Sequence, residues 1–291
     1  MTRRIRVAIA AVATGLFNAA AQTPTPARAG FEVASIKLNP ACGGGRGSGP
    51  PTPGRLEITC ASLHDLIQQA YGIFANGPKF TLKRLRITGG PAWLDSDAYT
   101  ISAKADGGTP IWQMNGPMLQ ALLEERFALK LHREMREGSV YDLTIAKGGP
   151  KLKATPEGGC VPLDLNQNRL PGPQTPGGPH VRYCGSTQSM SNMGKTTMSG
   201  WGATMANLAG MLSPGVGRDI IDKTGLTGMF DYHLEFSRDE VRAQVDAGEA
   251  SMPEGSSLFT AIEEQLGLKL VSAKGPVEYV VIDHIERPTD N

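Results

Sequence analysis

The chain has 291 residues, of which 40% are hydrophobic, which suffices for one large domain or two modest domains with packed cores. Its formal net charge is +1 at pH 7, so its overall charge favours neither nucleic acid nor an anionic membrane as a partner. Its 36 glycines and 21 prolines predict many turns and long loops.

Residues 1–21 have the pattern of a secretory signal peptide. Arg3, Arg4 and Arg6 form a basic start, residues 7–17 are apolar, and small residues offer a cleavage site near Ala21. An uncleaved membrane anchor is the alternative. No later segment is long and apolar enough to predict a transmembrane helix. We therefore predict a periplasmic or secreted protein without a transmembrane segment after signal cleavage.

Four cysteines, an even number in an exported chain, predict disulfide bonds. Three pairings are possible for Cys42, Cys60, Cys160 and Cys184. We favour nearest neighbours, Cys42 with Cys60 and Cys160 with Cys184, because each bond would close a loop of roughly twenty residues rich in Gly and Pro. A zinc site is the weaker alternative, because the cysteines lack C-x-x-C spacing and no nearby pair of histidines completes a ligand set.

The first half of the mature chain shows alternating strand patterns and two helix patterns. Ser62 is a candidate N-cap, followed by Leu63, Leu66 and Ile67 on one helical face. A second helix is predicted at 117–127. Strands are predicted at 31–37, 55–59, 82–88 and 99–105, followed by a closing hairpin of 129–132 and 140–146. Residues 151–193 change character and are predicted to form a Gly/Pro-rich linker or disulfide loop.

The second half repeats this order and ends in a near-copy of an earlier stretch. Residues 258–287 align with residues 121–147, so that Glu124 pairs with Glu263 and Leu129 with Leu268. We therefore predict an internal duplication. The fold class is α+β, with two related β-α-β-β-α-β-β units at 30–150 and 194–291, each with helices packed on a mainly antiparallel sheet. Whether the units share one sheet stays open.

One strand carries a candidate catalytic or metal-binding face. Asp231, His233 and Glu235 alternate along the strand predicted near 230–236, so they share one face and could ligate a metal or supply a base with an orienting acid. An ordinary polar strand face is the favoured interpretation, because the matching positions in the first half carry no such set.

Other chemical motifs are incomplete. Lys223-Thr224-Gly225 resembles a motif of penicillin-recognising enzymes, but no serine in the chain has a lysine three residues on. The basic cluster 79–86 has little aromatic interleaving, which argues against nucleic-acid binding. Trp93, Trp112 and Trp201 are interpreted as packing residues at turns. We therefore predict no catalytic residues, no metal ligands and no cofactor.

Several motifs together resemble a known family, an uncharacterised group of exported proteins expanded in soil acidobacteria. They span residues 31–291 and read FEVASIK, ASLHDLIQQAYGI, GGPAWLDSDAYTISAKA, LLEERFALKLHRE, DIIDKTGLTGMFDYHLEF, SLFTAIEEQLGLKL and VEYVVIDHIERPTDN. The resemblance implies a domain of unknown function. Some relatives are joined to antibiotic-sensor-type membrane metallopeptidases, which implies sensing or ligand recognition. The second half is also similar to the short N-terminal domain of secretins and TonB-dependent receptors, a module for protein contacts.

These observations favour a non-enzymatic binding, interaction or sensing module. Its expected partner is an envelope protein or a small ligand. The alternative is a periplasmic hydrolase or metal-dependent enzyme that uses Asp231, His233 and Glu235. We expect the functional site where the two copies differ, in the two disulfide loops and the turn at 222–228.

Overall fold

The computed structural model describes residues 30–42, 47–48, 52–78, 85–167, 181–192, 195–237 and 257–288. The predicted signal peptide at 1–21 lies outside these residues, as does most of the basic cluster 79–86. None of the helices in this described part is long and apolar enough to cross a membrane.

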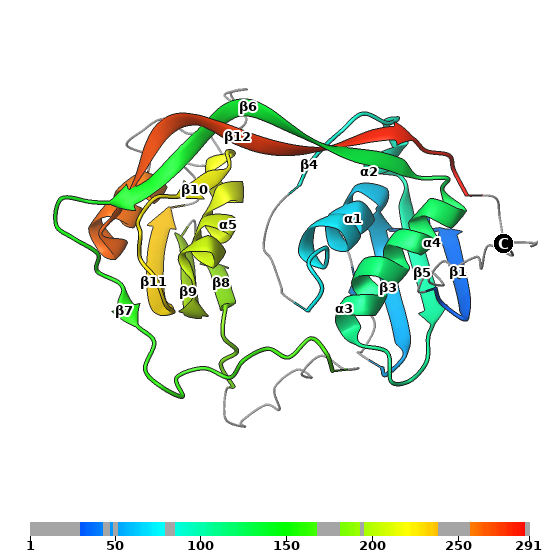
Figure 1. The fold of residues 1–291 in the computed structure, drawn as a ribbon, viewed down its shortest axis with the longest axis horizontal. Coiled ribbons are helices and arrows are strands. Elements are labelled where there is room, and N and C mark those ends of the chain that lie inside the picture. Colours follow the sequence, from blue (N-terminus) through cyan, green and yellow to red (C-terminus); the bar gives the residue numbers. More distant parts are fainter. Residues whose placement is uncertain are drawn as a thin grey trace, which may run out of the picture.

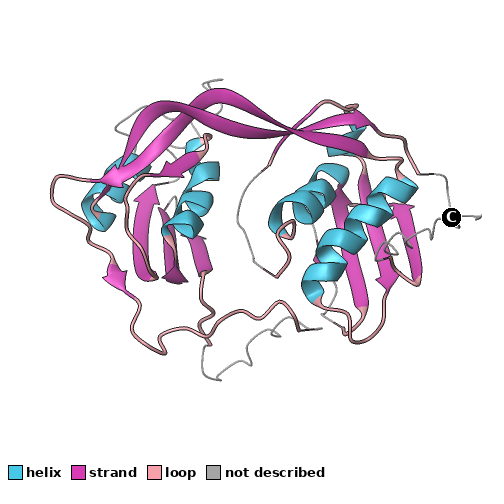
Figure 2. Cartoon of the chain, in the orientation of Figure 1, coloured by secondary structure: helices cyan, strands magenta, loops and turns pink. Residues whose placement is uncertain are grey.

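The fold is α+β, as predicted, with two lobes under a long two-stranded ribbon (Figure 1). The first lobe is an antiparallel four-stranded sheet in the order β1-β5-β3-β2, covered by helices (Figure 2). Its strands are β1 (Val33–Leu38), β2 (Gly47–Ser48), β3 (Arg55–Ser62) and β5 (Ala98–Lys104). The second lobe is another antiparallel four-stranded sheet, in the order β7-β11-β9-β8. Its strands are β7 (Lys153–Ala154), β8 (Ser186–Asn192), β9 (Lys195–Ala203) and β11 (Phe230–Ser237).

Short helices, several continued by π-helical turns, cover these sheets. In the first lobe they are α1 (Leu63–Ile67) with the π-helical segment Gln68–Ile73, α2 (Trp93–Ser96), α3 (Ile111–Gln113), the π-helical segment Met114–Met118, and α4 (Leu119–Arg126). In the second lobe they are α5 (Met205–Val216) and α7 (Ser257–Ala261) with the π-helical segment Ile262–Leu266.

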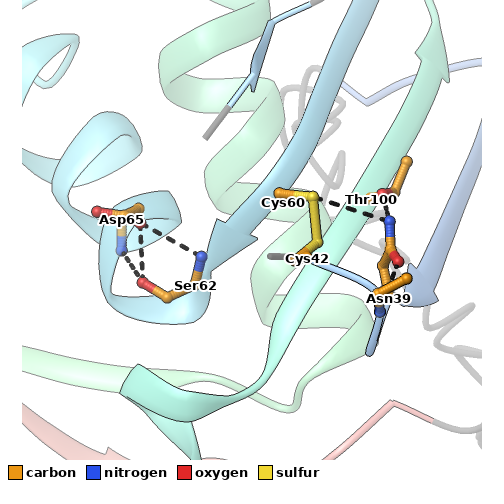
Figure 3. Close-up of a disulfide and its surroundings, with 7 residues drawn as sticks. Asn39, Cys42, Cys60, Ser62, Asp65 and Thr100 are labelled. Atoms are coloured by element: carbon orange, nitrogen blue, oxygen red, sulfur yellow. Dashed lines mark hydrogen bonds between the residues drawn. A yellow bond between two sulfur atoms is a disulfide. The ribbon is translucent and has the colours of Figure 1, made fainter. Parts of the chain in front are cut away.

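Capping boxes begin α1 and α5. The Asp65 amide donates to Ser62 Oγ at 3.1 Å, and the Ser62 amide donates to Asp65 Oδ2 at 3.3 Å (Figure 3). Thr204 and Asn207 form the same reciprocal pair at the start of α5. The prediction of Ser62 as an N-cap is therefore confirmed, and these bonds satisfy amides that the first helical turn leaves without partners.

Replacing Ser62 with Ala should lower the free energy of unfolding by about 1 kcal/mol, because an N-terminal amide of α1 then loses its acceptor. Chemical denaturation measures the change. Ser62→Asp is the matched control, since Asp is an equally good N-cap and should restore most of the stability. Equal stability of the Ala variant and the unaltered protein would contradict this role for Ser62.

The ribbon consists of β6 (Lys130–Ile145) and β12 (Leu268–His284), which pair antiparallel along their whole length. Two short strands extend it in parallel, β10 (Ile220–Asp222) beside β6 and β4 (Arg86–Thr88) beside β12. The third sheet therefore has the order β10-β6-β12-β4.

The closing hairpins predicted at 129–132 with 140–146, and for the matching segment 268–285, are wrong. Each pair of segments forms one continuous strand, and the two strands pair with each other. Gly138 and Gly275 lie opposite each other in the middle of the ribbon. A Cβ at Gly138 would lie 2.8 Å from Val277, and one at Gly275 would lie 2.8 Å from Ile221. The two glycines therefore permit close packing inside the strands instead of ending them.

Each strand of the ribbon contributes residues to the core of the lobe in which it ends. The core of the first lobe contains Val280 and Ile282 from the end of β12, while that of the second contains Tyr141 and Leu143 from the end of β6. An edge-to-face aromatic pair lies in each core, Tyr99 with Phe127 in the first and Tyr141 with Phe259 in the second. The division into units at 30–150 and 194–291 stays a prediction, and the packed cores show that each lobe draws residues from both ranges.

Both disulfides have the predicted nearest-neighbour pairing. Cys42 and Cys60 are bonded in the first lobe with their Cα atoms 5.5 Å apart (Figure 3), and Cys160 and Cys184 are bonded in the second lobe at 5.0 Å. The pairing confirms the disulfide interpretation over the zinc alternative for these four cysteines.

Candidate ligand-binding pocket between the lobes

A pocket of about 410 Å³ lies where the two lobes and the ribbon meet, and we call it the inter-lobe pocket. The first lobe and its neighbouring strand β4 contribute His64, Leu85, Arg86, Ile87 and Thr88. The C-terminal end of α5 and the residues after it contribute Ser213, Pro214, Gly217, Arg218 and Asp219, and the ribbon contributes Tyr279. Pockets of several hundred Å³ at domain junctions are common sites for small molecules.

Local structure explains how the charged residues reach this pocket. Arg86 and Thr88 are two positions apart on β4 and therefore lie on the same face of that strand. Helix α5 ends at Val216, and the next residue, Gly217, has a φ of 68°, in the left-handed region that favours glycine. The chain turns there and places Arg218 and Asp219 between the helix and β10.

An ion pair crosses the inter-lobe pocket. Arg86 Nε lies 3.4 Å from Asp219 Oδ2, and the two side chains are 33% and 30% exposed. At that exposure the pair contributes at most about 1 kcal/mol. Nearby, the Arg218 guanidinium lies over the Tyr141 ring at 5.1 Å and donates to Ser272 Oγ at 3.2 Å. The pocket thus contains side chains of both charges that come from different lobes.

Thr88 adds a buried hydroxyl to the pocket lining. Within the described part of the chain, Thr88 Oγ1 is buried and has no hydrogen-bond partner. A buried polar group left in this state costs about 1–3 kcal/mol, so proteins rarely keep one without a reason.

The structure places Asp231, His233 and Glu235 on β11 but gives each a different partner. Asp231 Oδ1 accepts from Thr155 Oγ1 at 2.7 Å and from the Gly202 amide at 3.0 Å. Glu235 accepts from Lys195 Nζ at 2.5 Å, and this hydrogen bond lowers the pKa of its carboxyl. Among the described residues no group of three or more His, Cys, Asp or Glu side chains could hold a metal ion.

His233 has one contact of chemical interest. Its Nδ1 lies 2.9 Å from Ser199 Oγ on the neighbouring strand β9. Both residues border a second pocket of about 400 Å³, together with Trp201 and Asp231. The bonds of Asp231 and Glu235 to other groups leave them as poor orienting acids for this imidazole, unlike the carboxylate of a catalytic triad.

One region expected to carry function, the turn at 222–228, contains an internal hydrogen-bonded contact. Asp222 Oδ1 accepts from the amide and the hydroxyl of Thr224 at 2.9 and 2.7 Å, which closes the turn at 222–228. Outside the regions expected to carry function, Trp93 and Trp201, which we interpreted as packing residues, each lie beneath an arginine, Arg287 and Arg182 respectively.

Sequence reasoning missed the charged residues of the inter-lobe pocket. Arg86 appeared only as the end of a basic cluster, and Asp219 only as the first residue of a family motif. Arg86 and Asp219 are separated by 133 positions, so no spacing rule joins them. Charged residues beside short apolar strands were the available signal, and they do not identify a partner.

A family model described as "Protein of unknown function (DUF3738)" matches residues 64–285. This range is more than half of the chain. The chain belongs to the DUF3738 family. Every residue lining the inter-lobe pocket falls within the range matched to DUF3738, as do β6 and β12 of the ribbon. Neither a curated protein nor a solved structure matches the chain.

Proposed function

We propose that this DUF3738 protein is an exported, non-enzymatic recognition module that binds a small ligand in the inter-lobe pocket. The observation that carries the proposal is the convergence of Arg86 and Asp219, one from each side, in a cavity of about 410 Å³. A ligand that contacts both residues would hold the two lobes together. A partner protein could then recognise the ligand-bound form.

Export is part of this proposal. Disulfide bonds form and persist in oxidising compartments, and this chain has two of them. The signal-peptide pattern at 1–21 supports a periplasmic or secreted location. An envelope protein is the proposed partner that senses the ligand-bound form. This agrees with the family resemblance, which implies that some relatives are joined to membrane metallopeptidases.

Replacing Arg86 with Ala should weaken ligand binding at least tenfold, because a hydrogen bond to a charged group contributes about 1.5–3 kcal/mol. Thermal-shift screening of small polar metabolites, followed by isothermal titration calorimetry, identifies a ligand and measures its dissociation constant. Lys195→Ala is the matched control, because it removes an ion pair on β9 and β11 outside the inter-lobe pocket. Equal weakening by both variants, or binding that neither changes, would contradict the assignment of this pocket.

The Ser199–His233 contact supports the second candidate function, a periplasmic hydrolase. We expect no turnover of ester, amide or glycoside substrates by the unaltered protein, because neither nearby carboxylate orients His233. His233→Ala should then leave the protein folded and its ligand affinity unchanged. Turnover that disappears in both Ser199→Ala and His233→Ala would establish the hydrolase and overturn the non-enzymatic assignment.

A further inference from the structure

We infer that the ligand of the inter-lobe pocket is a zwitterion with a free ammonium group and a free carboxylate, such as an unblocked amino acid or short peptide. The inference rests on the proposed function, which places a small ligand in this pocket. It adds the chemical class of that ligand, from the charges and surfaces that line the cavity.

The first step concerns the ion pair itself. Direct charge-assisted hydrogen bonds have donor-to-acceptor distances of about 2.7–2.9 Å, whereas Arg86 Nε and Asp219 Oδ2 are 3.4 Å apart. Both side chains are about one-third exposed. The pair is therefore long and accessible, so a ligand can replace each partner with an opposite charge of its own at little cost.

Arg86 provides the site for a carboxylate. Its contact with Asp219 uses Nε, and among the described residues its terminal amino groups have no other hydrogen-bond partner. A guanidinium has five N–H donors in a planar fork that matches a carboxylate in bidentate geometry. A ligand carboxylate can therefore bind these terminal groups.

Asp219 provides the site for an ammonium group. It follows the C-terminal end of α5, a 12-residue helix, whose last turn lines the pocket through Ser213 and Pro214. The final carbonyls of a helix lack intrahelical donors and carry the negative end of its dipole, which favours a cation. Asp219 and the C-terminal end of α5 therefore both contribute to the lining of the cavity.

The remaining walls select the body of the ligand. Leu85, Pro214 and Tyr279 also line the cavity and add apolar surface to it. A simple anion would pair with Arg86 but not with Asp219, and a simple cation would pair with Asp219 but not with Arg86. A zwitterion with an apolar side chain pairs with both Arg86 and Asp219 and covers these apolar walls.

Three matched probes test the inference on the full-length protein by isothermal titration calorimetry. The probes are dileucine, its N-acetyl derivative, which lacks the ammonium, and its C-terminal amide, which lacks the carboxylate. We expect dileucine to bind at least tenfold more tightly than either derivative. Asp219→Asn should reduce the preference over the N-acetyl form to less than threefold, and Arg86→Ala should do so for the preference over the amide. Thermal unfolding checks that both variants remain folded.

The outcomes separate this inference from the proposed function. If dileucine does not bind, or if the N-acetyl form or the amide binds as tightly as dileucine, the inference that the ligand is a zwitterion is wrong. If a simple anion such as phosphate or succinate then binds and Arg86→Ala weakens it, the inter-lobe pocket still stands as a ligand site. If no small molecule of any charge binds, both the inference and the proposed function fail.

Discussion

Replacing Ile282 with Ala will destabilise the first lobe, although Ile282 lies near the end of the chain. Ile282 is 7% exposed and packs in the first core, and removal of a buried isoleucine side chain beyond Cβ costs about 2–5 kcal/mol. Hydrogen exchange measured by mass spectrometry should show faster exchange in β5 and α4, which belong to that lobe.

The matched control lies on the same strand. Leu268 is fully buried in the second core, at the opposite end of β12 from Ile282. Leu268→Ala should therefore raise exchange first in β9 and β11 of the second lobe. If both substitutions raise hydrogen exchange in the same lobe, the claim that β12 contributes its two ends to different cores is wrong.

Removing the Cys160–Cys184 disulfide will lower the free energy of unfolding by about 3 kcal/mol, the second large effect that we expect. The bond joins positions 24 apart, and a loop of that length constrains the unfolded chain by roughly this amount. It also holds 160–161 beside 182–184, where the Val161 amide donates to the Arg182 carbonyl and the Cys184 amide to the Val161 carbonyl. Chemical denaturation of the double variant Cys160→Ser, Cys184→Ser measures the loss.

The second disulfide gives the comparison for that experiment. The double variant Cys42→Ser, Cys60→Ser should lose a similar amount of unfolding free energy, and hydrogen exchange should rise only in the first lobe.

Because both disulfides stabilise the fold, we also expect a reducing agent to lower the melting temperature of the unaltered protein. An unchanged melting temperature after verified reduction would show that neither bond stabilises the fold.

The local elements could be predicted from sequence because their signals are local. Ser62 has the residue type and spacing of a capping box, and strands such as β5 and β11 alternate apolar and polar residues. The course of the ribbon could not be predicted in the same way. Alternation shows which face of a strand is buried, but it does not show which strand lies beside it. A glycine in a strand pattern is compatible either with a turn or with a close approach of a neighbouring side chain. At Gly138 and Gly275 the strands continue, and neighbouring side chains pack closely against both glycines.

The candidate site was harder to predict for the same reason. The sequence placed Asp231 and His233 on one strand, and the structure agrees, yet their hydrogen bonds go to Thr155, Gly202 and Ser199 on other segments. The inter-lobe pocket forms only because the fold brings β4 close to the residues that follow α5. That contact depends on the tertiary arrangement alone, so no local motif marked Arg86 and Asp219 as neighbours.

Internal duplication stays a prediction, and the ribbon adds support to it. The aligned residues Leu129 and Leu268 come at matching places, immediately before β6 and at the start of β12. Each of these strands then crosses to the other lobe, where it pairs in parallel with a short strand of similar length, β10 or β4. A duplication of one strand-exchanging unit would produce this symmetry.

A crystal structure of the protein bound to the tightest small molecule from the binding screen is the most direct test of the inter-lobe pocket as its functional site. We predict ligand density between β4 and the C-terminal end of α5, with an anionic group on Arg86 and a cationic group on Asp219. Density in the pocket beside Trp201 and His233, with the inter-lobe pocket unchanged, would contradict the assignment.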